Sequence, residues 1–138
     1  MIKLNVYLNF PKDSEKALNF YKEALGGTVN VQYYRDMPDK TNLPEEALDK
    51  VLHGALVSND IVIMASDLVE GFGPPVVYGN NFTLSIQNNN LDEAKKVFEL
   101  LSQGGKVIMP LEKTFWGAIY GQFIDKFGIN WMVNCEEV

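Results

Sequence analysis

The chain has 138 residues, of which 46% are hydrophobic and 22% are charged, and this balance predicts a folded globular domain and excludes extensive disorder. Its formal net charge of -6 excludes a general nucleic-acid or anionic-membrane binder, because either surface requires a cluster of Lys and Arg. No run is long enough to span a membrane, the single Cys135 allows no internal disulfide, and no signal peptide is expected at the start, so we expect a cytoplasmic protein.

The first half of the sequence predicts a strand, a helix and three further strands. Alternating residues over 2–10 indicate the first strand. Asp13 or Ser14 can cap the helix that follows, which Gly26 and Gly27 end. Strand-like runs come next, and a loop rich in acidic residues and proline interrupts them at 36–50. These runs occupy residues 28–35, 50–57 and 61–66.

The second half repeats this order after a stretch rich in Gly and Pro at residues 70–81. A strand over 81–87 leads to a helix that Gly104 and Gly105 end, and strand-like runs follow at 106–110, 117–124 and 129–134. The last two runs flank the polar turn DKFG and therefore predict a β-hairpin. We expect one domain over residues 1–138, made of a first module at 1–68, a linker at 69–78 and a second module at 79–138.

The two halves resemble each other weakly but in order, which indicates an internal repeat. HGALVSNDIVIMASD (53–67) aligns with YGQFIDKFGINWMVNCE (120–136). The alignment matches His53 to Tyr120, Gly54 to Gly121, Leu56 to Phe123 and Met64 to Met132; in the helices it matches Ala17 to Ala94 and Tyr21 to Phe98. The sequence therefore predicts an α+β fold of tandem βαβββ modules.

One helix in each module can cover only one face of its sheet, so the composition of the opposite face is informative. That face is predicted to carry amides, hydroxyls, aromatic rings and methionines, with no Lys or Glu at the assigned positions. A face exposed to water is common in antiparallel sheets, but it normally carries charges. Uncharged polar and apolar groups together favour the wall of a semi-enclosed pocket.

Four stretches carry a resemblance to a known family: YLNFPKDSEKALNFYKEALGG, DKVLHGALV, IVIMASD and MPLEKTFWGAIYGQFIDKFGINWMVNCEE. On these residues the chain resembles the vicinal oxygen chelate (glyoxalase/bleomycin resistance/dioxygenase) superfamily, and especially its PhnB-like branch, often labelled 3-demethylubiquinone-9 3-methyltransferase domain. The resemblance implies paired βαβββ modules that form a curved mixed sheet with a cleft, and assembly as a homodimer. Methyltransferase activity is not expected, because no Gly-rich loop follows the first strand.

Catalytic members of this superfamily bind a divalent metal through the first and last strands of each module. The resemblance implies that the four ligand positions fall here on Asn5, Met64, Asn81 and Met132. Amides and thioethers are poor ligands for Zn, Ni, Mn or Fe, which prefer nitrogen or anionic oxygen, so we expect no metal and no cofactor. His53 is the only histidine and is expected to be a hydrogen-bonded cleft residue.

Two functions remain open at this point. The first is a metal-free protein that holds an aromatic or amphipathic small molecule, with hydrogen bonds from His53 and Tyr120 and adaptable walls from the methionines. The second is a divalent-metal-dependent lyase, isomerase or dioxygenase whose ligands lie off the usual positions, with His53 among them. Trp116 either borders the cleft or packs in a dimer contact. The expected cleft residues are His53, Tyr120, Met64, Met132, Tyr7, Asn5, Asn81, Trp116 and Asn130.

Overall fold

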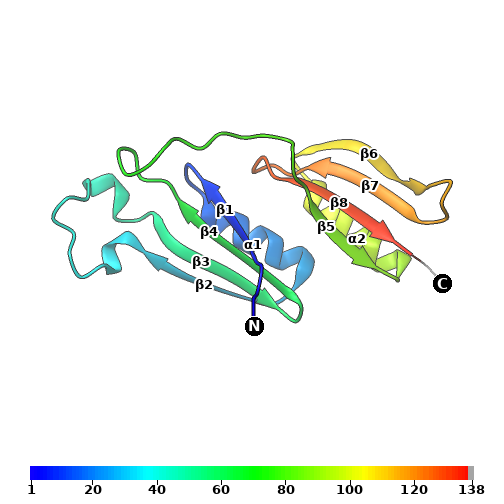
Figure 1. Cartoon of the computed structure of the whole chain (residues 1–138), viewed down its shortest axis with the longest axis horizontal. Coiled ribbons are helices and arrows are strands. Elements are labelled where there is room, and N and C mark those ends of the chain that lie inside the picture. The colour runs from blue at the N-terminus through cyan, green and yellow to red at the C-terminus, as the bar shows by residue number, and fades with distance from the viewer. Residues whose placement is uncertain (137–138) are drawn as a thin grey trace. The chain divides into compact units, whose positions relative to one another are not determined.

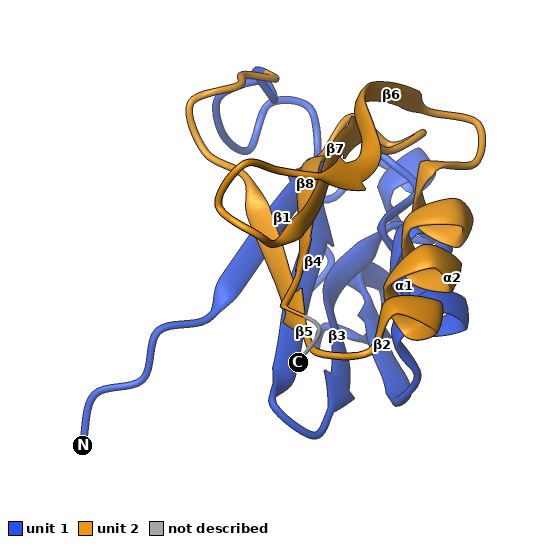
Figure 2. Ribbon diagram, turned by 90° about the vertical axis from the view of Figure 1, so that its right-hand side faces the viewer, with its two compact units in different colours: residues 1–77 blue, residues 78–138 orange. Residues whose placement is uncertain are grey.

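The computed structural model describes residues 1–136, and the chain divides into two compact units, residues 1–77 and 78–138 (Figure 2). Unit 1 contains β1 (Val6–Phe10), α1 (Ser14–Leu25), β2 (Thr28–Tyr33), β3 (Val51–Ser58) and β4 (Ile61–Asp67). Two short 3-10 helices, η1 (Tyr34–Asp36) and η2 (Glu45–Ala47), lie between β2 and β3. Unit 2 contains β5 (Leu84–Asn88), α2 (Leu91–Ser102), β6 (Lys106–Lys113), β7 (Ile119–Ile124) and β8 (Asn130–Cys135) (Figure 1). The predicted α+β fold with two βαβββ modules is confirmed.

Each unit forms its own four-stranded mixed sheet with the same topology. The strand orders are β1-β4-β3-β2 and β5-β8-β7-β6. In each sheet the first strand of the unit pairs in parallel with the last, and the other neighbours are antiparallel. The helix of each unit packs on one face of that unit's sheet, which leaves the other face without a helix (Figure 2). No helix in the described part of the chain combines the length and apolar character needed to cross a membrane.

The strand register confirms the predicted internal repeat. Gly54 pairs with Ala65 in unit 1, and Gly121 pairs with Val133 in unit 2. Leu56 likewise pairs with Ile63, as Phe123 does with Trp131. His53 and Tyr120 therefore occupy equivalent positions, and so do Met64 and Met132.

The first strand of each unit begins later than the sequence predicted. Leu4 is 96% exposed and Phe82 is 67% exposed, and both precede the strands that they were expected to join. Val6 pairs with Ile63 and Leu84 with Trp131, so the equivalent of Asn5 is Thr83 and not Asn81. The alternation of apolar and polar residues continues before β1 and β5 in the sequence. Alternation alone does not show where pairing with the neighbouring strand begins.

A glycine in the third strand of each unit lets the helix approach the sheet closely. A Cβ on Gly54 would lie 2.8 Å from Leu18 Cδ1, and one on Gly121 would lie 2.6 Å from Phe98 Cε2. Both glycines therefore face the helix. Because side chains alternate along a strand, the preceding residues, His53 and Tyr120, face away from it.

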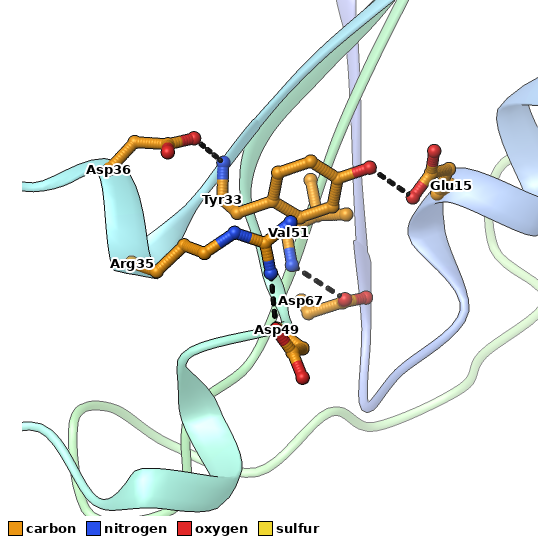
Figure 3. Close-up of polar contacts among 7 residues, drawn as sticks. All are labelled: Glu15, Tyr33, Arg35, Asp36, Asp49, Val51 and Asp67. Carbon is orange, nitrogen blue, oxygen red and sulfur yellow. Dashed lines mark hydrogen bonds and ion pairs between the residues drawn. The ribbon is translucent and has the colours of Figure 1, made fainter.

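The start of α1 is capped by a residue that the sequence analysis did not assign. Asp13 has a left-handed backbone and makes no capping bond, and the buried Ser14 Oγ has no hydrogen-bond partner within residues 1–136. The carboxylate of Asp67, at the end of β4, accepts hydrogen bonds from the Ser14 N–H at 3.0 Å and the Val51 N–H at 2.9 Å. Figure 3 shows the bond to Val51. The predicted cap by Asp13 or Ser14 was wrong, because a partner distant in sequence supplies it.

A group of polar contacts holds the start of the segment between β2 and β3 (Figure 3). The Tyr33 hydroxyl donates to Glu15 Oε1 of α1 at 2.6 Å, and the Tyr33 N–H donates to Asp36 Oδ2 at 3.0 Å. Arg35 pairs with Asp49, and its guanidinium lies 4.4 Å from the centre of the Tyr33 ring. The hydrogen bond to Glu15 is the main cause of a raised Tyr33 pKa. These bonds attach the segment to the helix-covered side of unit 1.

The turn between β7 and β8 is organised by one buried carboxylate. Asp125 Oδ1 accepts from the N–H groups of Phe127 at 2.8 Å and Ile129 at 3.1 Å. Its Oδ2 accepts from Trp131 Nε1 at 2.8 Å. The sequence predicted this hairpin and its polar turn DKFG, and the structure confirms the hairpin.

Candidate functional site

The sheet face of unit 1 that lies away from α1 carries no charged strand residue. We call it the open face of unit 1. The strand register places on it Tyr7, Asn9, Thr28, Asn30, Gln32, His53, Ala55, Val57, Val62, Met64 and Ser66. Tyr7, His53 and Met64 were predicted to lie on this face, and the strand pairing adds the uncharged side chains of β2 and of the rest of β3. The face is therefore amide, hydroxyl, aromatic and aliphatic across all four strands.

Tyr7 and His53 form the central polar pair of this face. The Tyr7 hydroxyl lies 3.1 Å from His53 Nδ1, and the two ring centroids are 5.6 Å apart. If Tyr7 donates to a neutral imidazole, His53 Nε2–H keeps a free donor; if Nδ1–H donates, the Tyr7 O–H keeps one. The pair thus offers a hydrogen-bond donor with either tautomer.

Tyr34 provides a second phenol near the end of β4. Its hydroxyl donates to the Asp67 carbonyl oxygen at 3.1 Å. Burial raises the pKa of Tyr34, and the negative charge of Asp67 raises it further. Tyr34 therefore stays a neutral donor at neutral pH. Lys50 anchors the same end of the sheet, because its Nζ donates to the carbonyl oxygens of Leu68 at 2.9 Å and Pro11 at 3.2 Å.

The corresponding face of unit 2 contains a network of amides. The Asn134 amide nitrogen donates to Gln87 Oε1 at 3.0 Å, and Gln87 Nε2 donates to Ser85 Oγ at 2.8 Å. The Asn130 amide nitrogen donates to the carbonyl oxygen of Gly79 at 2.9 Å. These hydrogen bonds connect β8 with β5 and with the segment before β5. They give a structural reason for part of the uncharged polar composition of this face.

Next to these amides lies a row of aromatic residues and a methionine, which we call the aromatic row: Phe115, Trp116, Tyr120 and Met132. The rings of Phe115 and Trp116 pack edge to face with their centroids 4.9 Å apart, and the centroids of the Trp116 and Tyr120 rings are 6.2 Å apart. The Tyr120 hydroxyl points at Met132 Sδ, 3.8 Å away. The structure thus brings together three of the predicted cleft residues, Trp116, Tyr120 and Met132.

The edge strand β6 adds charges that the sequence analysis missed. Glu112 pairs with Tyr120 and Lys106 pairs with Ile124. Both charged residues therefore lie on the face of the unit 2 sheet that points away from α2, which is the face of Tyr120. The register of β6 shifts between Val107 and Met109 and again between Met109 and Glu112. Simple alternation could not assign faces along such a strand. Only the pairing of the β6–β7 hairpin identifies them.

The remaining predicted residues are placed as follows. Tyr7, His53 and Met64 share the open face of unit 1, with Tyr7 directly beside Met64 in the parallel pair. Asn130 lies on the same face of β8 as Met132. Asn5 and Asn81 are exposed residues outside the strands.

The side chains at and beside the implied ligand positions do not suit a divalent transition metal. The implied positions carry the amides of Asn5 and Asn81 and the thioethers of Met64 and Met132. The parallel pairs place only hydroxyls beside the two thioethers, from Tyr7 and Ser85. Zn, Ni, Mn and Fe prefer imidazole, thiolate or carboxylate ligands. Within residues 1–136, no three side chains of His, Cys, Asp or Glu gather closely enough to hold a metal. His53 therefore lacks partners of the required chemistry in the described part of the chain.

Comparison with known proteins identifies the family. The model of the Glyoxalase/Bleomycin resistance protein/Dioxygenase superfamily matches residues 3–133. Protein YjdN of Escherichia coli K12 is 27% identical over 137 residues, which cover 95% of this chain and 93% of YjdN. The crystal structure of PA1353 from Pseudomonas aeruginosa is 34% identical, with a TM-score of 0.88 over 100% of both chains.

A PhnB protein from Bacillus cereus, which carries the name 3-demethylubiquinone-9 3-methyltransferase, shares the fold with a TM-score of 0.76. It is 22% identical, and the match covers 97% of this chain and 99% of that one. The predicted superfamily and the PhnB-like fold are thereby confirmed. The chain belongs to the Glyoxalase/Bleomycin resistance protein/Dioxygenase superfamily.

Proposed function

We propose that this protein binds a small aromatic or amphipathic molecule without a metal, and that the open sheet face of each unit, taken by itself, is a surface for such a ligand. The observation that carries the proposal is the open face of unit 1, which is uncharged across four strands and centred on the Tyr7–His53 pair. A soluble protein that exposed this surface only to water would gain from charges there. Their absence favours a surface that a ligand covers.

The physical properties of the face suit such a ligand. Tyr7 is 44% exposed and Val57 is 48% exposed, so apolar surface is available for contact. Burying an unpaired charge beneath a ligand is costly, whereas burying aromatic, thioether and hydrogen-bonded amide groups costs little. Met64, beside Tyr7, can adapt its shape to the ligand. The Tyr7–His53 pair then supplies a donor to a carbonyl, phenolic or carboxyl oxygen.

The catalytic relatives implied by the family use a divalent metal, but the donor set here disagrees with that chemistry. The amides and thioethers at the implied ligand positions, and the hydroxyls beside the thioethers, do not offset the cost of removing water from a dication. We therefore propose a metal-free site. The metal-dependent lyase, isomerase or dioxygenase remains the competing function.

A ligand screen tests the binding function. Metabolites and antibiotics are screened by thermal shift, and hits are measured by isothermal titration calorimetry. Tyr7→Phe should weaken a hit that uses the open face of unit 1 about three- to tenfold, since it removes one hydrogen bond worth about 0.5–1.5 kcal/mol.

Tyr33→Phe is the matched control, because it also removes a bonded phenol but on the side of α1. Equal affinities for both variants and the wild type would show that a hit binds away from this face. A screen without any saturable hit would contradict the binding function.

Metal analysis separates the two functions. Protein purified without chelator should contain no stoichiometric Zn, Ni, Mn or Fe, and micromolar Ni²⁺ or Zn²⁺ should not raise its melting temperature saturably. A saturable rise that disappears in His53→Ala would make His53 a ligand. The metal-dependent enzyme would then be the better interpretation.

A further inference from the structure

We infer that the aromatic row of unit 2 selects planar aromatic cations, with Glu112 supplying the complementary charge; this inference rests on the proposed small-molecule function. The proposal adds a ligand class and a specificity residue on unit 2. It depends on the exposed rings, on how their turn is held, and on the position of Glu112.

The rings of the row are available for stacking. Phe115 is 97% exposed and Trp116 is 57% exposed, although they contact each other edge to face. Tyr120 continues the row onto the sheet, and its hydroxyl is directed at the polarisable sulfur of Met132. The faces of aromatic rings carry partial negative charge, and they attract cations, most strongly in the case of Trp. A flat cation can therefore gain both stacking and electrostatic attraction here.

The turn that carries the two exposed rings is held in place. Thr114 donates twice to the Ala118 carbonyl oxygen, from its N–H at 2.8 Å and from its Oγ1 at 2.7 Å. Gly117 takes a φ of 95°, which closes the turn in a conformation that other residues rarely adopt. A preorganised turn loses less conformational entropy when a ligand binds.

Glu112 gives the row its charge. It is exposed and pairs directly with Tyr120, which puts the two Cβ atoms about 5 Å apart. Lys113 pairs with Ile119 and so points to the other side of the sheet. Lys106 shares the face of Glu112 but pairs with Ile124, about 13 Å along β7 from Tyr120. That separation exceeds the screening length of about 8 Å at physiological salt, so Glu112 dominates the field at Tyr120.

The ligand that fits these groups is a fused or extended aromatic ring system with a fixed positive charge. Its plane would stack on Trp116 or Tyr120, and its charge would lie towards Glu112. An aromatic anion of the same size would meet the repulsion of Glu112 and of a chain with a net charge of -6. Charge, rather than ring size, is the property of a ligand that the aromatic row distinguishes.

The experiment compares N-methylquinolinium, a planar aromatic cation, with 2-naphthoate, an anion of similar shape. Binding is followed by calorimetry and by tryptophan emission. The chain has two tryptophans, and Trp131 is only 2% exposed, so quenching by a ligand on the aromatic row reports on Trp116. We expect saturable quenching by the cation, with an affinity about tenfold higher than that of the anion, and loss of quenching in Trp116→Phe.

Glu112→Gln should lower the affinity for the cation about threefold at low salt, as expected for the loss of one exposed charge pair. The affinity for the anion should stay equal or rise. Lys113→Gln, a charge change of the same size on the other side of the same strand, should leave the preference for the cation intact. Circular dichroism verifies that both variants are folded. Equal binding of the two probes, or an unchanged cation affinity in Glu112→Gln, would overturn the inference.

These outcomes are separable from failure of the proposed function. If neither probe binds while a ligand from the screen binds and responds to Tyr7→Phe, the charge selection is wrong and the proposed function stands. If no probe and no screened compound binds saturably, both are wrong.

Discussion

Replacing Asp67 by Asn should destabilise unit 1 strongly, although the two side chains have almost the same shape. Asp67 is 5% exposed, and each of its carboxylate oxygens accepts one backbone N–H, from Ser14 and from Val51. An asparagine keeps one acceptor and replaces the other by an NH₂ group. Whichever way the amide is turned, one backbone N–H then faces a donor.

The expected cost follows from these contacts. A hydrogen bond to a charged group contributes about 1.5–3 kcal/mol, and a buried N–H without a partner costs about 1–3 kcal/mol. The charge at the start of α1 adds about 0.3–1 kcal/mol through the helix dipole. Because these contributions overlap, we expect a loss of about 3 kcal/mol in the free energy of unfolding. That is a large part of the roughly 5–15 kcal/mol of a typical domain.

The assay is urea unfolding followed by far-ultraviolet circular dichroism, with tryptophan fluorescence in parallel. Both tryptophans lie in unit 2, so a shift seen by circular dichroism but not by fluorescence would assign the loss to unit 1. Ser14→Ala is the informative comparison. A capping serine would cost about 1 kcal/mol on replacement, whereas the unbonded Ser14 hydroxyl should cost less than about 0.5 kcal/mol. A stable Asp67→Asn together with a destabilised Ser14→Ala would refute the assignment of the cap.

Three further outcomes are expected. Because the Tyr34 pKa is raised in the folded state, its contribution to stability is complete below the unfolded pKa of about 10 and is lost as the pH rises through the folded value. The free energy of unfolding, measured in urea, should therefore fall less steeply above about pH 10 in Tyr34→Phe than in the wild type. An unchanged dependence on pH would contradict the burial of this phenol. Gly121→Ala should lose about 1–3 kcal/mol in urea unfolding, because its Cβ meets Phe98, whereas Gly79→Ala should change little. Light scattering at micromolar concentration should give twice the mass of one chain, as expected for the homodimer, and a purely monomeric mass would exclude it.

The order of elements and the internal repeat could be predicted from the sequence because they depend on local patterns. The helices carry apolar residues at helical spacing, and the glycines that face Leu18 and Phe98 fall at matching positions of the two halves. The pairing of Gly54 with Ala65 and of Gly121 with Val133 agrees with that alignment. The spacing of apolar residues and the matching of the two halves were sufficient to predict the order of helices and strands.

Features that depend on partners distant in sequence could not be predicted. No local pattern shows that Asp67 caps a helix that begins 53 residues earlier. The charge of Glu112 beside Tyr120 depends on irregular pairing in β6, which alternation does not reveal. For the site, the face of His53 could be predicted from alternation, but its bond to Tyr7 required the pairing of β1 with β4.

The two helices differ in how their first turns are satisfied, and this difference affects the order in which the units can fold. In α2 the cap is local, since Asn90 Oδ1 accepts the Glu93 N–H at 3.0 Å. That turn can form as soon as its own residues have left the ribosome. The first turn of α1 instead requires β4, so it stays incompletely bonded until the chain has been synthesised beyond Asp67. Any fragment of unit 1 that ends before β4 therefore carries an incompletely bonded first turn of α1, and its β1 has no strand partner.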